Sequence, residues 1–259
     1  MCGVIVPLGG DKVEIKLNRT SYIETKERII ATHPEWPFTV TLDDYTYEGE
    51  TRIANAASIC YGKDEAKLGK ALTSKLVHHH KHIDTLRFAY MTMKLDNVST
   101  GAHVQLVRIA HFGLLVMSSR YVDIADRSNV LPVSLQKETE YFNLDEIGEE
   151  FDLPVPDISD GGTNEMDLDE FLKLQKLMYA ALRKRGIPKE DARYINIDAR
   201  ATSMWFSANL QAWAHLFRLR LPKKVMPETR AVAQTMFAIA QDLYPLIFTD
   251  EFYQFCNNS

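Results

Sequence analysis

Residues 105–121, QLVRIAHFGLLVMSSRY, place isolated polar side chains in an otherwise apolar segment. Gln105 and Arg108 are three positions apart, so on a helix they would share one face. After an apolar run, two hydroxyls, backbone N–H groups and a guanidinium come together at Ser118, Ser119 and Arg120. Such donors can bind an anion. The alternative is structural: a buried helix that enters a polar turn, with its arginines paired to carboxylates.

The length and charge of the chain limit its domain organisation and the kinds of partner that it can bind. It has 259 residues and a formal net charge of −5. This length suits one large domain or two small ones with a substantial core. Because the chain has no overall positive charge, we do not expect nucleic acid as a partner. Any anion that it binds must be bound by arginines close to the site. No apolar run could span a bilayer and no signal-peptide pattern is present, so we expect a cytoplasmic protein without a membrane partner.

The residue types that bind metals are not spaced as a metal site. Cys2, Cys60 and Cys256 are far apart in the sequence, which fits a reducing compartment without disulfides. In residues 78–82, HHHKH, adjacent histidines cannot share a helical face, and no acidic or cysteine ligand is spaced to complete a site. We therefore predict a solvated histidine cluster and no metal.

Apolar periodicity predicts the elements of the first half. Residues 2–8 and 13–17 are predicted to form a strand and its hairpin partner, and residues 22–32 a helix that ends before His33 and Pro34. Residues 38–42 and 88–95 alternate as strands, whereas residues 50–60 carry apolar side chains at helical spacing.

The second half is predicted to be mostly helical after a surface loop region at residues 122–163. Asp167 favours the start of a long helix, and the basic residues 183–185 favour its end. Pro188 begins a short helix, and two further helices follow at residues 209–220 and 228–244. Eleven residues make almost three turns, so both ends of the 209–220 helix lie nearly on one stripe.

Residues 105–121 resemble the signature of the flavin-dependent thymidylate synthases: Arg-His-Arg, two residues, Ser, one residue, Asn-Glu, one residue, Ser, one residue, Arg. Arg108, Ser118 and Arg120 match the first Arg, the last Ser and the last Arg at the same spacing. The positions that differ are Ile109, Ala110, Gly113, Leu115 and Val116. The preceding strand, turn and helix are also similar, with Ser99 six positions before Gln105.

Two other motifs resemble the cofactor side of that family. Its pattern His, one residue, Ser, one residue, Leu-Glu-His corresponds to residues 82–88, where Asp84, Arg87 and Phe88 differ. Its Asn-Ala-Arg corresponds to residues 209–211, where Gln211 replaces the arginine and removes a charge. The resemblance implies that the cofactor is bound by His82, Asn209, Gln211 and His215. From spacing alone, Asn209 and His215 could equally be satisfied polar groups of a helix.

For the nucleotide, the resemblance implies two sets of residues. Those acting on the pyrimidine would be Arg220, Arg108 and Gln105. Those binding its phosphate would be Ser118, Ser119, Arg120 and Arg193. Arginine suits both tasks because its planar fork binds phosphate or carbonyl oxygens in pairs.

The resemblance covers about residues 38–248. It implies an α/β (α+β) domain, residues 38–259, with an antiparallel sheet flanked by helices, an N-terminal extension of residues 1–37, and a homotetramer. The implied reaction is one-carbon transfer to C5 of a pyrimidine deoxynucleoside monophosphate, dUMP or dCMP, with FAD, methylenetetrahydrofolate as donor and NADPH as reductant. Val116, in place of a glutamate near the base, suggests a changed base or a hydroxymethyl product. The alternative is a non-catalytic nucleotide-binding paralogue that acts as a sensor or assembly partner.

Overall fold

The computed structural model describes residues 16–23, 26–62, 71–79, 81–123, 127–136, 140–151, 154–155, 158, 162–192 and 195–259. The chain forms two compact units, Met1–Met117 with Ala201–Ser259, and Ser118–Arg200. The strand predicted at residues 2–8 lies outside the described residues. Within these ranges, no helix combines the length and apolar character needed to cross a membrane.

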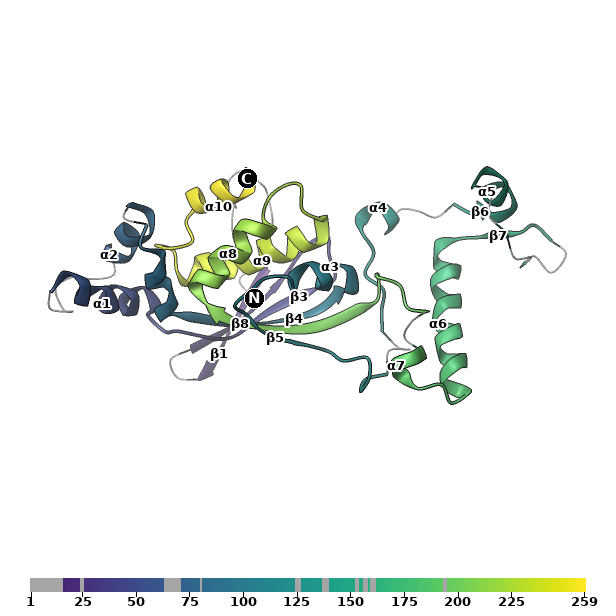
Figure 1. Cartoon of the computed structure of the whole chain (residues 1–259), viewed down its shortest axis with the longest axis horizontal. Coiled ribbons are helices and arrows are strands. Elements are labelled where there is room, and N and C mark those ends of the chain that lie inside the picture. The colour runs from purple at the N-terminus through teal and green to yellow at the C-terminus, as the bar shows by residue number, and fades with distance from the viewer. Residues whose placement is uncertain are drawn as a thin grey trace. The chain divides into compact units, whose positions relative to one another are not determined.

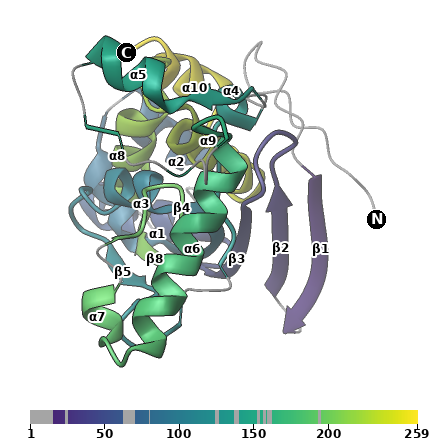
Figure 2. The ribbon, with the colours of Figure 1, turned by 90° about the vertical axis from the view of Figure 1, so that its right-hand side faces the viewer.

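The first unit is built on an antiparallel sheet (Figure 1), with six strands in the described residues in the order β1-β2-β3-β4-β8-β5. The strands are β1 (Lys16–Ile23), β2 (Lys26–Thr32), β3 (Thr39–Tyr45), β4 (Tyr90–Ser99), β8 (Ala201–Asn209) and β5 (Gly113–Val116). Figure 2 shows β1 and β2 continuing the sheet beyond β3. These two strands belong to residues 1–37, whose status as an extension stays a prediction.

The helix predicted for residues 22–32 is wrong, because this segment contributes to β1 and β2. In β2, Ile29 and Ala31 are fully buried, whereas Arg28 and Thr32 are exposed. That period of two follows from pairing with β3, where Ile29 lies opposite Leu42. A pairing partner later in the chain therefore overrides the local pattern.

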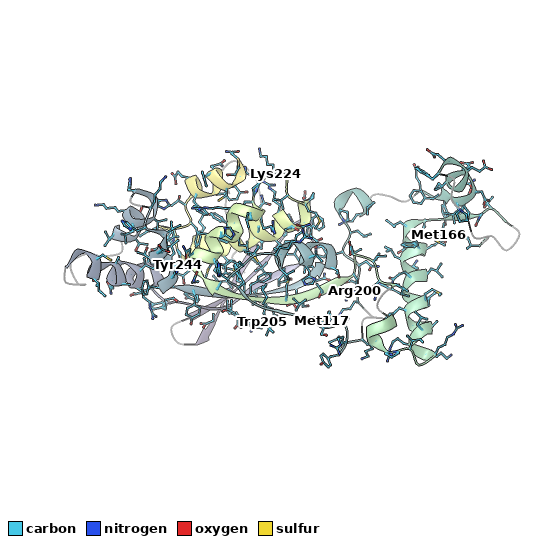
Figure 3. All side chains as sticks on the ribbon, in the orientation of Figure 1. Met117, Met166, Arg200, Trp205, Lys224 and Tyr244 are labelled. Carbon is cyan, nitrogen blue, oxygen red and sulfur yellow. The ribbon has the colours of Figure 1, made fainter. Side chains whose placement is uncertain are left out.

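Helices cover one face of this sheet (Figure 1): α3 (Thr100–Leu106), α8 (Leu210–Arg220) and α9 (Pro227–Leu243). The strand β8 shows the consequence, since Met204 and Phe206 are buried while Trp205 between them is partly exposed. Figure 3 shows Trp205 on the side of the sheet away from these helices. One covered face is typical of antiparallel sheets. The helices predicted at residues 209–220 and 228–244 and the strands predicted at residues 38–42 and 88–95 are confirmed.

An aromatic core holds α8 against α9. Trp213 is fully buried and donates from Nε1 to the Met91 carbonyl of β4 at 3.1 Å. The Phe217 ring centroid lies 6.0 Å from that of Trp213, 5.1 Å from Phe237 and 5.3 Å from Phe248. The pairs of Phe217 with Phe237 and Phe248 are edge-to-face, an arrangement that adds to the stabilisation from burial. The core therefore fixes the position of α8 on the sheet.

The polypeptide between β3 and β4 forms α1 (Gly49–Tyr61), α2 (Ala71–Ser74), the π-helical turn η2 (Lys75–His79) and the 3₁₀ helix η3 (Ile83–Phe88). The helix predicted at residues 50–60 is confirmed by α1. Its first residue has to be small, because a Cβ on Gly49 would lie 2.6 Å from the Tyr244 ring. Tyr244, labelled in Figure 3, donates its hydroxyl to the Thr46 carbonyl at 2.9 Å.

The second unit contains α4 (Val133–Gln136), β6 (Phe142–Asn143), α5 (Leu144–Phe151), β7 (Glu165–Met166), α6 (Leu168–Lys184) and α7 (Lys189–Ala192). The long helix is confirmed by α6, which begins with a capping box between Asp167 and Glu170. The loop predicted at residues 122–163 is wrong in part, because it contains short elements. Asn164 stabilises them: its carbonyl accepts from the Leu144 N–H at 2.8 Å and its amide donates to Asp145 at 2.9 Å.

The Tyr244 contact can be tested by Tyr244→Phe. The phenylalanine would remove this donor, while the Gly49 N–H still donates to the Thr46 carbonyl at 3.1 Å. We therefore expect the free energy of unfolding to fall by about 0.5–1.5 kcal/mol. Urea denaturation measures the change, and Tyr47→Phe, at an exposed ring, is the control. Equal stability of Tyr244→Phe and the wild type would contradict the assignment.

Candidate functional site

A buried carboxylate holds the start of α3. Ser99 caps this helix, with its Oγ accepting from the Ala102 N–H at 3.0 Å. Glu228 at the start of α9 accepts from the Ser99 N–H at 2.7 Å and also from the Ser99 hydroxyl. Burial raises the pKa of Glu228, while the hydrogen bonds from Ser99 oppose that rise. These contacts fix the start of α3, and therefore the path of the chain to Gln105 in its last turn.

Arg220 joins the end of α8 to the end of α3. Its Nη2 donates to the Gln105 carbonyl oxygen at 2.5 Å. Its Nε is buried without a hydrogen-bond partner among the described residues. Burial, followed by the nearby positive charge of Arg108, lowers the pKa of Arg220. Two close guanidinium groups repel each other, so an anion or a carbonyl oxygen placed between them would be attracted to both.

The arginines of residues 105–121 test the structural alternative, which expects them to have carboxylate partners. Within the part of the chain that the structure describes, neither Arg108 nor Arg120 forms an ion pair, and the Gln105 side-chain amide makes no hydrogen bond. A ligand could therefore form hydrogen bonds or ion pairs with these two guanidinium groups and with the Gln105 amide.

Two local predictions about residues 105–121 are wrong. Because α3 ends at Leu106, Arg108 lies in the following turn rather than on a shared helical face. The apolar run forms β5 rather than a buried helix, since Leu114 pairs with Phe206 of β8. Pairing with a strand far along the chain decides the conformation here, as it does in β2.

The polar turn predicted after this run is confirmed in the second unit. The N–H groups of Tyr121 and Val122 donate to the Ser118 carbonyl at 3.1 and 3.0 Å, and the Arg120 N–H donates to the Ser118 hydroxyl at 3.3 Å. Ser119 is buried, whereas Arg120 is exposed. Arg193 lies outside the described residues.

A cavity of about 860 Å³ lies beside α8 in the first unit. Asn209, Gln211 and His215 line it, so the structure brings together three of the four predicted cofactor-binding residues. Asn209 also caps α8, because its Oδ1 accepts from the Ala212 N–H at 3.0 Å. His82 is exposed, and the two residues beside it, Lys81 and Ile83, line the cavity. Its volume is typical of a cofactor site.

Residues that the sequence analysis missed form the rest of this wall. They come from η2, η3, α8 and α10 (Asp250–Asn257), of which α10 is a helix that was not predicted. Arg218 of α8 places its guanidinium carbon 5.7 Å from the ring centroid of Phe252 and 5.9 Å from that of Phe255, within cation–π range. The sequence contains a signal for the start of α10, because Thr249 before Asp250 is a residue type that caps helices. In the structure, the Thr249 hydroxyl accepts from the Phe252 N–H at 3.2 Å.

No group of three His, Cys, Asp or Glu side chains in the described ranges could hold a metal ion. In the histidine cluster, Nε2 of His78 lies 3.0 Å from the Leu246 carbonyl oxygen, and His79 is exposed. His80 falls outside the described residues. The histidines described here contact neighbouring chain segments or solvent.

The sequence profile of the family described as thymidylate synthase complementing protein matches residues 41–246. A flavin-dependent thymidylate synthase from Geobacter sulfurreducens is 26% identical over 220 residues, which cover 82% of this chain and 85% of that protein. The enzyme of the same name from Pyrococcus furiosus is 26% identical over 230 residues, which cover 80% and 82%. The family resemblance drawn from the motifs is thereby confirmed.

A solved structure shows the same fold. It is the crystal structure of thymidylate synthase X from Helicobacter pylori with FAD and dUMP, which matches with a TM-score of 0.57 at 20% identity and covers 82% of this chain and 97% of that one. The predicted α/β fold with an antiparallel sheet and flanking helices is confirmed.

The Glu228 contact predicts a pH-dependent stability. Because its folded-state pKa is raised above the ordinary value of 4.5, its contribution is fully present below the unfolded pKa and is lost as pH rises through the folded pKa. The wild type should therefore lose stability relative to Glu228→Gln as pH rises above that ordinary value. Urea denaturation over a pH series measures the difference, and a difference that does not change with pH would refute the assignment.

Proposed function

Because this chain belongs to the thymidylate synthase complementing protein family, we propose that it transfers a one-carbon unit to C5 of a pyrimidine deoxynucleoside monophosphate, with dUMP as the first candidate. The observation that carries the proposal is the pair of guanidinium groups of Arg108 and Arg220, which lie close together at the end of α3 without a carboxylate partner among the described residues. Relatives that share four fifths of the chain are flavin-dependent thymidylate synthases.

One set of residues is assigned to the base of the nucleotide and another to its phosphate. Arg220 and Arg108 bind the carbonyl edge of the pyrimidine and favour the negative charge that develops when C5 becomes a nucleophile. The Gln105 amide, which has no partner among the described residues, adds a donor and an acceptor beside them. The phosphate is assigned to Ser118, Ser119, Arg120 and Arg193, and the whole assembly to a homotetramer. All of these assignments follow the family pattern. The assignments for the base are also supported by Arg108 and Arg220, which have no carboxylate partner among the described residues.

The cysteines do not suit the role of nucleophile. Cys256 is buried, and burial raises the pKa of its thiol to about 12, so it stays protonated. Cys60 is exposed on α1 and does not line the cavity. In the described part of the chain, activation of C5 therefore depends on positioning and electrostatics rather than on attack by a thiolate.

The cavity beside α8 fits a flavin. The related Helicobacter structure contains FAD with dUMP, and here a cavity of about 860 Å³ is lined by Lys81, Arg87, Arg218 and the aromatic rings of α10. Asn209, Gln211 and His215 would hold the cofactor from α8, and His82 would approach it from the turn before η3. A bound reduced flavin would supply hydride for the transferred carbon, with methylenetetrahydrofolate as the source of that carbon and NADPH as the reductant of the flavin.

A changed base or product is the second candidate. Val116 lies in β5 opposite Met204, and it replaces a carboxylate of the family signature. Loss of that charge would alter recognition of the base, so dCMP as substrate and a hydroxymethyl product stay within the proposal. A protein that binds nucleotide without turnover would instead be the sensor or assembly partner.

Turnover tests the proposal. With FAD, NADPH and methylenetetrahydrofolate supplied, mass analysis of dUMP and dCMP should show one of them gaining a one-carbon unit. Arg220→Gln should lower kcat by roughly 10²–10³-fold, as expected for loss of a donor to developing charge. Arg52→Gln, at an exposed position of α1 outside the cavity, is the control.

Two outcomes would count against it. Unmodified nucleotide in every reaction would leave only the non-catalytic alternative. Full activity of Arg220→Gln would show that the arginine pair does not carry the reaction.

A further inference from the structure

Arg87 lies on the wall of the cavity beside α8 and is held there by two side chains. Its Nε donates to Gln211 Oε1 at 2.6 Å, and its Nη2 lies 3.1 Å from Asp84 Oδ1. Gln211 in turn donates from Nε2 to the same Asp84 oxygen at 3.3 Å. The three side chains form a closed triangle that connects η3 to α8, so the guanidinium has a defined position in the wall.

The guanidinium still has donors to offer. Among the described residues, the two contacts engage Nε and Nη2, which leaves Nη1 without a partner. The side chain is 61% exposed, so a ligand can reach it. The carboxylate of Asp84 is 79% exposed, and an ion pair so open to water neutralises little of the charge.

The cavity as a whole favours an anionic ligand that contains a ring. Three cations line it, Lys81, Arg87 and Arg218, against the single carboxylate of Glu251 among the described lining residues. The rings of Phe252 and Phe255 form part of the same wall and flank the Arg218 guanidinium. Aromatic surface and exposed cations together suit a planar ring that bears phosphate groups.

Sequence and structure together explain the loss of the arginine at position 211. The synthase pattern has an acid where this chain has Arg87 and an arginine where it has Gln211. Here the guanidinium comes from η3 instead of α8, and a 2.6 Å hydrogen bond joins the two positions. From the sequence alone, Gln211 leaves the cofactor side without a positive charge. In the structure, the facing residue Arg87 supplies that charge.

We infer that Arg87 binds a phosphate group of the FAD cofactor and takes the place of the arginine that Gln211 replaced. The inference rests on the proposed function for the identity of the cofactor, and on the triangle of Arg87, Gln211 and Asp84 for the residue. Gln211 and Asp84 are positioning residues, because they hold the guanidinium in the wall.

Titrations with FAD, ADP and riboflavin test the assignment, since riboflavin has the ring system without the phosphates. Arg87→Gln should weaken the binding of FAD and ADP by roughly tenfold to a hundredfold, as expected for loss of a charge-assisted hydrogen bond, and leave riboflavin unchanged. The double variant Arg87→Gln/Gln211→Arg returns a guanidinium to the same pair and should recover most of the loss. Arg52→Gln is the matched control, and circular dichroism checks that each variant is folded.

Each other result overturns the inference or the proposed function separately. Unchanged FAD and ADP affinity in Arg87→Gln would overturn the inference, and so would an equal loss for riboflavin, which would mean that the triangle only shapes the wall. If the protein binds ADP through Arg87 but does not bind FAD, the phosphate contact is supported and the flavin proposal is wrong. A wild type that binds neither would end both. If Arg87→Gln does not fold, Arg87→Lys, which keeps the charge but not the fork, should show a smaller loss for the phosphorylated ligands alone.

Discussion

The position of α3 depends on polar contacts at both of its ends. Glu228 accepts two hydrogen bonds from Ser99 at its start, and Arg220 donates to the Gln105 carbonyl at its end. Because these groups are wholly or partly removed from water, breaking either contact would leave a polar group poorly satisfied. Helices α8 and α9, fixed to each other by the aromatic core, therefore each hold one end of the short helix that presents Gln105.

In the proposed function, arginines that have no carboxylate partner among the described residues would bind the nucleotide. Arg108 lies near enough to Arg220 to lower its pKa, and neither has a carboxylate partner among the described residues. Arg87 and Arg218 line the cavity beside α8, which Arg108 and Arg220 do not line. Keeping like charges close costs stability in the free protein, and an anionic ligand removes that repulsion. Two ligands with negative groups, a pyrimidine nucleotide and a phosphorylated cofactor, match these two groups of cations.

Elements whose pattern is set by local burial were predictable from the sequence. The helices α1, α6, α8 and α9 and the strands β3 and β4 follow their apolar periodicity. The strands β2 and β5 were mistaken for helix, because their conformation depends on β3 and β8, which lie elsewhere in the chain. For the site, motif spacing put Asn209, Gln211 and His215 in one set, and the structure places all three on one cavity, while their cofactor role stays a prediction. Only the structure could show that Arg87 lies beside Gln211, since no pattern connects residues 124 positions apart.

We expect the pair of Arg108 and Arg220 to belong to a nucleotide site, and calorimetric titration with dUMP measures whether it does. Binding of dUMP should be saturable and should weaken as salt is added. Deoxyuridine, which lacks the phosphate, should bind much more weakly, and Arg108→Gln should lose affinity for dUMP. Absence of binding, or equal affinity for dUMP in the wild type and Arg108→Gln, would contradict it.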